Sequence, residues 1–430
     1  MGFLVLSCSR EGSSMRGNIG AALGVAVPFV LLLVLAGGAW GADNTLCFDC
    51  HKDEALSKEG AGGKEVSLHV PEADFKTSVH GKLSCSNCHT QITDDTHAAG
   101  GKQVRGHVAC GVCHAKVDRE YRQSLHAKAI MKETERAAYC YDCHGKHTIF
   151  SSRDPKSAVH LSNVAKTCNR CHSDKDFVKA HALGAGLTPG ELFKGSIHGQ
   201  SGEVTCTSCH GSHAVRSLLD PKSSIFRSNI PQTCGVCHAE ITEQFVDSIH
   251  GTQAAKGRGD SPTCTTCHGI HGIKAKIDPD SPVNERRIAQ TTCPQCHSAE
   301  QISREYGITR AQVKSYYDSF HGLSYRGGDT YSANCASCHG VHDILPSSDP
   351  KSMIHRDNLQ KTCGICHPGA SENFAKGKIH AVASIRGEEF GEKVVGWVRV
   401  VYIFLIVMTI GGMTFFNFTD WLRKTIERRP

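Results

Sequence analysis

The 430-residue sequence predicts a mainly α-helical protein with much irregular structure and one membrane-spanning helix near its C-terminus. Three observations favour this fold class. Turn motifs interrupt the chain throughout and leave room only for short helices. The region between residues 43 and 390 contains no Trp, so ordinary side chains supply little of its core. Residues 400–419 form an uncharged stretch of about the 20 residues that a bilayer-spanning helix requires.

Cysteine occurs almost entirely in one pattern. Of 23 cysteines, 22 fall into eleven copies of Cys-x-x-Cys-His, and the other is Cys8. This pattern attaches c-type haem: two thiols bind the haem vinyl groups and the adjacent imidazole binds the iron. Zinc knuckles, redox dithiols and disulfides do not require His after every second Cys. The sequence therefore predicts eleven covalent haems.

The predicted attachment cysteines and proximal histidines, in motif order, are Cys47, Cys50 and His51; Cys85, Cys88 and His89; Cys110, Cys113 and His114; Cys140, Cys143 and His144; Cys168, Cys171 and His172; Cys206, Cys209 and His210; Cys234, Cys237 and His238; Cys264, Cys267 and His268; Cys293, Cys296 and His297; Cys335, Cys338 and His339; and Cys363, Cys366 and His367.

The motifs recur as a tandem tetrahaem array, since equivalent motifs are separated by 121 to 129 residues. An apolar run after Arg16, followed by small residues, predicts an export signal, with either Met1 or Met15 as the start. The predicted organisation is a signal peptide at 1–41, haem module 1 (haems 1–4) at 42–167, module 2 (haems 5–8) at 168–292, module 3 (haems 9–11) at 293–390, a transmembrane helix at 397–420 and a cytoplasmic tail at 421–430.

Smaller signals recur inside each module. Four motifs continue as Cys-x-x-Cys-His-Gly-x-His or close to it, and each is followed by an Asp-Pro turn. In three copies an Asn comes nine residues after that Asp, at Asn163, Asn229 and Asn358, and we expect it to N-cap the next motif's helix. Thr188-Pro189 and Thr309 also predict helix starts.

The histidine count bears on whether each iron carries electrons or binds substrate. Of 27 histidines, sixteen are not proximal. One group lies in Ser-x-His or similar elements that follow the odd-numbered motifs, and a second follows the even-numbered motifs. The predicted distal ligands are His80, His126, His198, His250, His321 and His380 in the first group, and His97, His147, His213, His271 and His342 in the second.

This set supplies one distal candidate for each haem. His97 departs from the Gly-x-His spacing, so His69 or His107 could replace it. The others, His160, His181 and His355, are expected to be surface or hydrogen-bonded residues. The pairings cannot be read from the sequence. However, a His three residues beyond a proximal His lies in the same helical neighbourhood, so we expect it to reach an adjacent haem.

Haem density predicts the core. Eleven haems over residues 47–371 leave too little protein to bury each macrocycle by side chains alone, so haems are expected to pack against haems. Iron between two imidazoles is closed to substrate, which favours electron transfer. The propionates of eleven haems would outweigh the formal charge of +6, so we expect no nucleic-acid partner.

The combination of CHGxH, DPKS, Asn before TCxxCH, and FxxSxHG resembles the multihaem c-type cytochromes of the cytochrome c3-like superfamily, over residues 47–380. The C-terminal segment WVRVVYIFLIVMTIGGMTFFNFTDWLRK resembles the helix that links multihaem domains to quinol-oxidising cytochrome b partners. This resemblance implies a separate membrane subunit. No Cys-x-x-Cys-Lys motif, the active-site signature of pentahaem nitrite reductases, occurs in the chain.

The sequence thus favours a membrane-anchored undecahaem cytochrome that relays electrons in anaerobic respiration. Its expected partners are a quinol-oxidising or quinone-reducing membrane subunit, periplasmic redox proteins and the membrane. Glu388, Glu389 and Glu392 precede the span, and Arg423 and Lys424 follow it. This charge distribution places the haem region in the periplasm and the tail in the cytoplasm. The alternative is a reductase that acts on an inorganic oxyanion or nitrogen compound at one open haem; an electron-transfer protein is favoured over an enzyme.

Overall fold

The computed structural model describes residues 44–59, 63, 65–92, 108–132, 136–180, 187–308, 311–375, 380, 384–386 and 390–427. The predicted signal peptide, His97, His107, His181 and Thr309 lie outside these residues. Within the described ranges, the predicted fold class is confirmed. Short helices joined by turns make up most of the chain, with one two-stranded antiparallel sheet and one long C-terminal helix.

The elements follow the motifs closely, and most haem motifs lie on a short helix. The elements up to the fifth motif are α1 (Thr45–His51), β1 (Ser57–Glu59), β2 (Glu65–Ser67), α2 (Glu72–Thr77), α3 (Cys85–Cys88), η3 (Cys110–Val112), α4 (Ala115–Tyr121), α5 (Leu125–Met131), α6 (Cys140–His144) and α7 (Leu161–His172). Those up to the eighth motif are α8 (Lys175–Ala180), α9 (Pro189–Lys194), α10 (Ile197–Ser201), α11 (Cys206–His210), η4 (Arg227–Asn229), α12 (Ile230–Gly235), α13 (Ala239–Asp247), α14 (Ile249–Ala255) and α15 (Cys264–His268).

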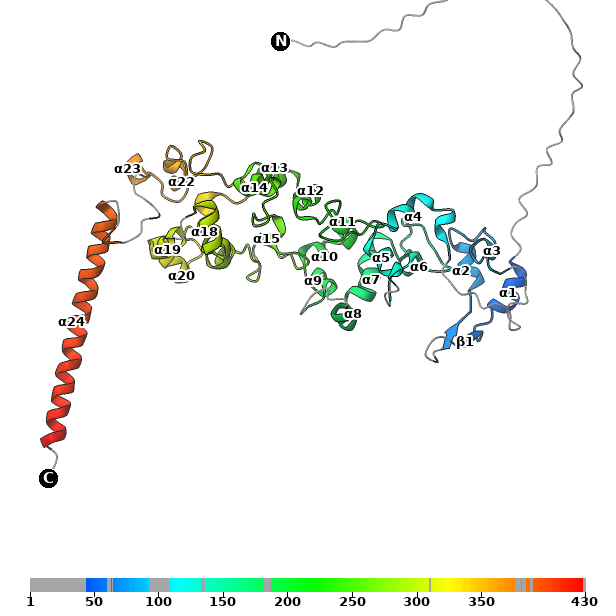
Figure 1. The fold of residues 1–430 in the computed structure, drawn as a ribbon, viewed down its shortest axis with the longest axis horizontal. Coiled ribbons are helices and arrows are strands. Elements are labelled where there is room, and N and C mark those ends of the chain that lie inside the picture. Colours follow the sequence, from blue (N-terminus) through cyan, green and yellow to red (C-terminus); the bar gives the residue numbers. More distant parts are fainter. Residues whose placement is uncertain are drawn as a thin grey trace, which may run out of the picture.

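The remaining elements are α16 (Glu285–Arg287), η5 (Ile288–Thr292), α17 (Pro294–His297), α18 (Glu300–Tyr306), α19 (Ala311–Asp318), α20 (Phe320–Arg326), α21 (Cys335–His339), α22 (Leu359–Gly364), α23 (Glu372–Ala375) and α24 (Phe390–Glu427). Together the elements form an elongated array that follows the sequence order (Figure 1). The sheet and α1 lie at one end, and α24 projects from the other.

The apolar core of the described chain is small. Its buried hydrophobic side chains are Phe48, Ala127, Val164, Val178, Ala254, Ala289 and Tyr325. Buried serines and threonines are more numerous than these apolar residues. Such hydroxyl side chains close turns by hydrogen bonding, but they contribute little hydrophobic free energy. The protein interior therefore depends on something besides its own side chains, as the lack of Trp predicts.

The Asp-Pro turns form a repeated hydrogen-bonded unit. In the copy that begins at Asp220, buried Ser223 donates its hydroxyl to Arg216 O at 3.5 Å. Thr233, which precedes the next motif, donates to Ser224 O at 2.6 Å. The same two types of bond recur in the other three copies. Each turn is thus tied to the helix that follows it.

The asparagines play a different part from the predicted one. Asn163 lies inside α7, whose N-cap is His160. Asn229 and Asn358 precede helices, but their side chains make no cap bond. All three amides instead donate to two carbonyls of the preceding turn at 2.7–2.9 Å. The Asp-Pro turn brings two carbonyls within reach of one NH₂ group, whose two N–H bonds can be donated to both.

The Ser-x-His elements begin helices, with the serine as N-cap. In α14, Ser248 accepts a bond from Gly251 N at 3.0 Å and donates to Phe245 O at 2.6 Å. Ser124, Ser196 and Ser319 cap α5, α10 and α20 in the same way. The predicted start at Thr188-Pro189 is confirmed, because Thr188 and Glu191 form a reciprocal capping box on α9.

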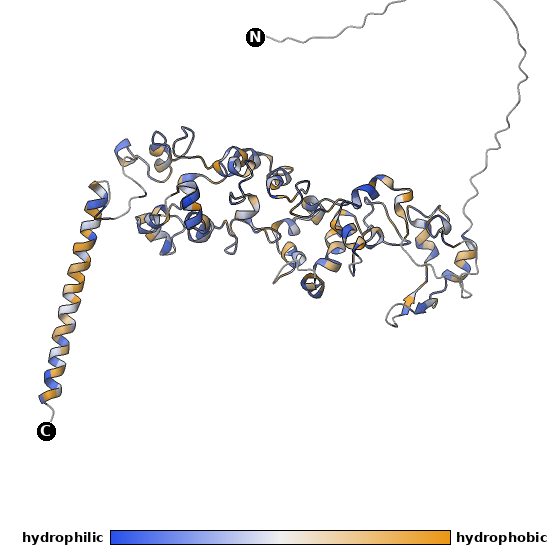
Figure 2. Ribbon diagram, in the orientation of Figure 1, coloured by the Kyte–Doolittle hydropathy of each residue, from blue (hydrophilic) through white to orange (hydrophobic). Residues whose placement is uncertain are grey.

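Helix α24 is 38 residues long and contains the predicted span 397–420. Most of α24 is coloured as hydrophobic in the ribbon of Figure 2, and almost all of its large apolar residues are exposed. By length and composition α24 could cross a membrane. At 1.5 Å per residue it extends about 57 Å, which exceeds a hydrocarbon core of about 30 Å. Near its C-terminus, Asp420 pairs with Lys424 at 2.6 Å.

Replacing Ser248 by Ala should lower the free energy of unfolding by about 1 kcal/mol, because it removes a helix cap. The side chain is 1% exposed, so water cannot replace the lost bonds. Denaturant unfolding of the holoprotein measures the change. Exposed Ser298 is the matched control, and its replacement by Ala should change stability by less than about 0.5 kcal/mol. Equal effects at the two positions would contradict the role of the cap.

Candidate haem-binding sites

The structure brings proximal and distal histidines together in pairs. Ten pairs of imidazole rings have centres 5.9–6.3 Å apart. Each pair joins the proximal His of one motif to one predicted distal His. In motif order the pairs are His89–His147, His114–His80, His144–His213, His172–His126, His210–His271, His238–His198, His268–His342, His297–His250, His339–His380 and His367–His321.

This spacing fits one metal ion between two imidazoles. A metal–nitrogen bond is about 2 Å long, so two rings on opposite sides of one iron have centres about 6 Å apart. Direct packing of two rings would not require the same distance at ten places with different ring tilts. The residues present therefore fit bis-imidazole ligation of haem attached to each motif's cysteines.

The pairing follows a two-motif step. A distal His that follows an even motif pairs with the proximal His of the preceding even motif; for example, His271, after motif 8, pairs with His210 of motif 6. A Ser-x-His element pairs forward to the following odd motif, as His250, after motif 7, pairs with His297 of motif 9. No imidazole in these pairs faces its own motif. Pairs cross the predicted boundaries at 167/168 and 292/293.

One backbone hydrogen bond joins the two kinds of distal segment. In the second module, Ile249 N, beside His250, donates to Ile344 O, two residues after His342, at 2.8 Å. The same bond joins Val79 to Ile149, Leu125 to Val215, and Ile197 to Ile273, at 2.8–2.9 Å. Each bond therefore holds the distal His of an even motif close to the distal His of the next odd motif.

Backbone geometry separates the two ligand classes. In the Gly-x-His class, the glycine after the proximal His has positive φ, for example 83° at Gly269 and 89° at Gly145, a region that favours glycine. Interplanar ring angles for motifs 4, 6 and 8 are 8°, 15° and 12°. For the odd motifs 3, 5, 7, 9 and 11 the angles range from 43° to 60°. The even pair of motif 2, His89–His147, is tilted by 38° and departs from this pattern. From motif 3 to motif 9, tilted and near-parallel pairs alternate.

Motif 10 receives its partner differently. Its proximal His339 pairs with His380, from the segment before α24, at 6.2 Å and 41°. His380 Nδ1 donates to Gln312 O at 2.9 Å and lies 3.1 Å from Ser315 Oγ. A proton on Nδ1 leaves Nε2 as the metal-binding nitrogen. The repeat next to α24 thus uses contacts of the His380 imidazole with α19 to position the ligand.

The first motif has a comparable orienting contact. His51 Nδ1 donates to Leu68 O at 2.8 Å, which again leaves Nε2 for a metal. Leu68 directly follows β2, so the small sheet places this carbonyl. The predicted partner, His97, lies outside the described residues, as does His107. His69, the other alternative, lies next to Leu68, and its backbone N–H donates to Ser67 Oγ at 3.2 Å.

Two of the histidines expected to have no ligand role accept local backbone hydrogen bonds. His160 Nδ1 accepts from Ser162 N at 3.3 Å at the start of α7. His355 Nδ1 accepts from Asp357 N at 3.4 Å. Both occupy the same position after an Asp-Pro turn. Their shared position after an Asp-Pro turn is the sequence signal that separates these two histidines from the predicted distal ligands.

Burial favours the neutral form of several of the paired imidazoles. It lowers the pKa of His250 to about 4, and the nearby His297 adds to this effect. Burial is also the main cause of the lowered pKa of His172, His210 and His339. Neutral imidazole is the form that binds metal. The protein environment therefore favours the ligand state before any iron is present.

The first cysteines of successive motifs lie together in pairs. Their thiols interact between Cys47 and Cys85, Cys110 and Cys140, Cys168 and Cys206, Cys234 and Cys264, and Cys293 and Cys335. Second cysteines of even motifs lie close to cysteines of the next odd motif, as Cys267 does to Cys296. Each described attachment site therefore adjoins the next along the array.

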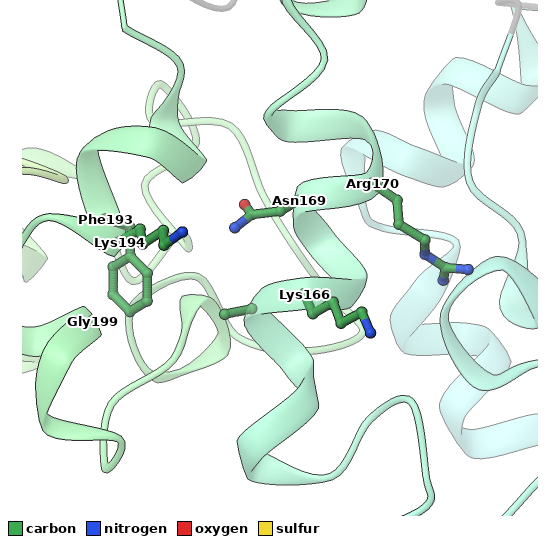
Figure 3. A pocket seen from close by; sticks show the side chains of 7 residues that line it. Lys166, Asn169, Arg170, Phe193, Lys194 and Gly199 are labelled. Carbon is green, nitrogen blue, oxygen red and sulfur yellow. The ribbon is translucent and has the colours of Figure 1, made fainter.

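An open cavity of about 450 Å³ lies between α7 and the α9–α10 segment (Figure 3). Its lining includes Asn169 of α7, Phe193 of α9 and Gly199, the neighbour of His198. The Arg170 side chain points away from Phe193 in this view, and its Nε donates to Thr167 O at 3.3 Å. The cavity thus lies between the helix of motif 5 and the distal ligand of motif 7, where a haem edge could lie.

Comparison with known proteins agrees with this geometry. Residues 96–173 match the family described as cytochrome c7 and related cytochrome c. That segment is similar to multihaem c-type cytochromes. It contains motifs 3, 4 and 5, and the similarity implies covalent haem c and electron transfer. No solved structure matches the chain.

Replacing His342 by Met should raise one reduction potential, by on the order of 100 mV, because thioether ligation favours ferrous iron. The site affected should be that of motif 8, whose His268 faces His342. A spectropotentiometric titration measures the change. His355→Met is the matched control, since His355 caps a turn, and it should leave all potentials in place. A titration of the His342 variant identical to wild type would contradict the pairing.

Proposed function

We propose that this protein is a membrane-anchored undecahaem cytochrome c that relays electrons between a membrane quinol or quinone partner and periplasmic redox proteins in anaerobic respiration. One observation supports it above all: paired histidines and adjoining attachment cysteines succeed one another from α3 to the segment before α24. An elongated series of closely spaced sites suits transfer between two distant partners, one at each end.

The bound group supplies one-electron exchange between ferric and ferrous iron. The chain's residues do the rest. Two imidazoles close each paired site to substrate, which favours transfer over catalysis, and this favours the relay over an oxyanion or nitrogen-compound reductase. The hydrogen bonds between distal segments fix the imidazole positions and keep neighbouring sites in register.

The arrangement of the anchor supports the proposed membrane partner. Helix α24 projects from the end of the array that holds motifs 10 and 11 (Figure 1). A span in the inner membrane would keep this end at the bilayer surface and leave the end with α1 exposed to periplasmic proteins. A quinol-oxidising or quinone-reducing subunit would then exchange electrons at the near end.

The mature exported protein should contain eleven covalent haems, because all eleven motifs are intact. Intact-mass measurement and the pyridine haemochrome assay give the number. Because all but the first proximal His have an assigned ring partner in the described residues, nearly all haems should be six-coordinate and low-spin. Nine or fewer haems in matured protein would refute the count.

The specific docking role of the anchor can be tested by exchanging its membrane part. Residues 400–427 are replaced by an unrelated transmembrane helix of equal length, which keeps Gly396 and everything before it. If α24 recognises a quinol-linked subunit, the chimera should reach the membrane with its full haem content but lose quinol-dependent reduction at least tenfold. The haem reduction rate in membrane vesicles, with dithionite reduction as the control, measures this. Wild-type rates would show that α24 is only a tether.

A further inference from the structure

We infer that Tyr325 of α20 is a positioning residue for the haem of motif 9, because its hydroxyl holds the π-helical turn that precedes Cys293. This turn, η5, absorbs one extra residue of the chain. The inference rests on the proposed haem at motif 9, but it requires no quinol partner and no direction of electron flow.

The segment before motif 9 is one residue longer than its counterparts. In this copy the first Cys, Cys293, comes 15 residues after Asp278. In the other three copies the distance is 14 residues, from Asp154 to Cys168, Asp220 to Cys234, and Asp349 to Cys363. The bond that ties the turn to the helix spans nine residues in those copies but ten here, from Thr292 to Pro282. The extra residue therefore lies between Pro282 and Thr292.

The backbone absorbs the extra residue in a π-turn. The helices that lead into the other three motifs, α7, α12 and α22, are α-helices. Here Ile288–Thr292 form a π-helix, and Cys293 N donates to Ile288 O, five residues before it, at 3.0 Å. A π-turn contains more residues than an α-turn. The insertion is thus taken up immediately before the first attachment cysteine.

The hydroxyl of Tyr325 lies within the backbone ladder of this segment. It donates to Glu285 O and accepts from Ala289 N at 3.4 Å. These two backbone groups bond to each other in an uninterrupted α-helix, and a side chain inserted between them distorts the helix locally. Tyr317 of α19 donates its hydroxyl to Ala289 O. Since Ala289 is 0% exposed and Tyr325 is 3% exposed, water does not replace these bonds.

The tyrosine occurs where the insertion occurs. Tyr325 is the fourth residue after the distal His321. The residues at the same place after the other predicted distal histidines of this class are small or aliphatic, namely Ser84, Ile130, Gly202, Ala254 and Ser384. Ala254 is also buried, and the helix before motif 7, α12, is a regular α-helix. The buried hydroxyl therefore accompanies the π-turn and is not a general feature of the repeat.

The π-turn orients both protein attachments of the haem. Cys293 directly follows η5, and its carbonyl accepts from His297 N at 3.1 Å. An α-helix turns by about 100° per residue, so relaxation of the π-turn to an α-turn would rotate the chain that follows it. The imidazole of His297 would then lose its present angle of 56° to that of His250. The Tyr325 hydroxyl thereby acts on the iron through the backbone.

The test uses the full-length holoprotein in mild detergent. Tyr325→Phe keeps the ring and removes the hydroxyl, so the amide of Ala289 should exchange with deuterium about tenfold faster in mass spectrometry. The largest g value of one low-spin haem should shift in electron paramagnetic resonance, with the haem content unchanged. Tyr331→Phe is the matched control. Tyr331 is 97% exposed, so its replacement should change neither measurement.

Deleting Gln290 locates the effect at the π-turn. The deletion restores the 14-residue spacing of the other copies, so the chain no longer needs a π-turn. Adding Tyr325→Phe to this variant should shift no signal. The inference is overturned if Tyr325→Phe leaves every signal unchanged in the full-length chain, or if it shifts the same signal equally in the deletion variant.

A second variant applies if the deletion variant is recovered without its full haem content. Tyr317→Phe removes the bond to Ala289 O and should shift the same signal as Tyr325→Phe, whereas no shift or a shift at a different haem overturns the inference. The mass of the peptide that carries Cys293 and Cys296 is measured first. A peptide without haem would refute the proposed cofactor at motif 9, while haem with an unshifted signal would overturn only the positioning role.

Discussion

The rest of the structure depends on the distance between two imidazole rings. A nearly constant separation of about 6 Å, which fits one iron between the rings, is kept between segments that are up to 74 residues apart, as in His268 and His342. The described chain buries only a few apolar side chains, so hydrophobic packing between helices cannot hold these segments by itself. In the proposed haem-loaded protein, metal ligation would take the place of a conventional core, and folding would be coupled to cofactor attachment. Buried serines and threonines also help to hold these segments, because their hydrogen bonds fix the turns that carry the ligands.

The sequence predicted the fold class and the histidines of the candidate sites, but it did not predict which histidines pair. Cys-x-x-Cys-His is a local motif whose chemistry requires its spacing, so it could be recognised wherever it occurred. The histidines that now face proximal rings were likewise recognisable, because His147, His213, His271 and His342 recur with the motifs. The pairing was not predictable, since a local pattern does not specify which of several nearby irons a side chain reaches. That information lies in backbone bonds between segments such as Ile249 and Ile344.

The asparagines show why the N-cap prediction failed even where an Asn stands directly before a helix. Asn is a good N-cap in isolation, and Asn229 does stand directly before a helix. In the folded chain its NH₂ group donates to two turn carbonyls at 2.8–2.9 Å, and in this orientation its oxygen accepts no bond from the helix N–H groups. His97 illustrates a different limit. Its motif departs from the repeat, so periodicity gave no support, and its assignment stays a prediction.

The two-motif step has a consequence for how such an array can change during evolution. Deleting one motif would leave the Gly-x-His and Ser-x-His elements whose pairs span the deletion facing a motif of the other class, while pairs wholly before or after it would stay matched. Removing or duplicating two consecutive motifs preserves both classes. Genes of this kind are therefore expected to lengthen and shorten by even numbers. Whatever the number of motifs, the last even motif of such an array lacks a following even motif to supply its distal His; here that motif is motif 10, and His380 faces its proximal His339 instead.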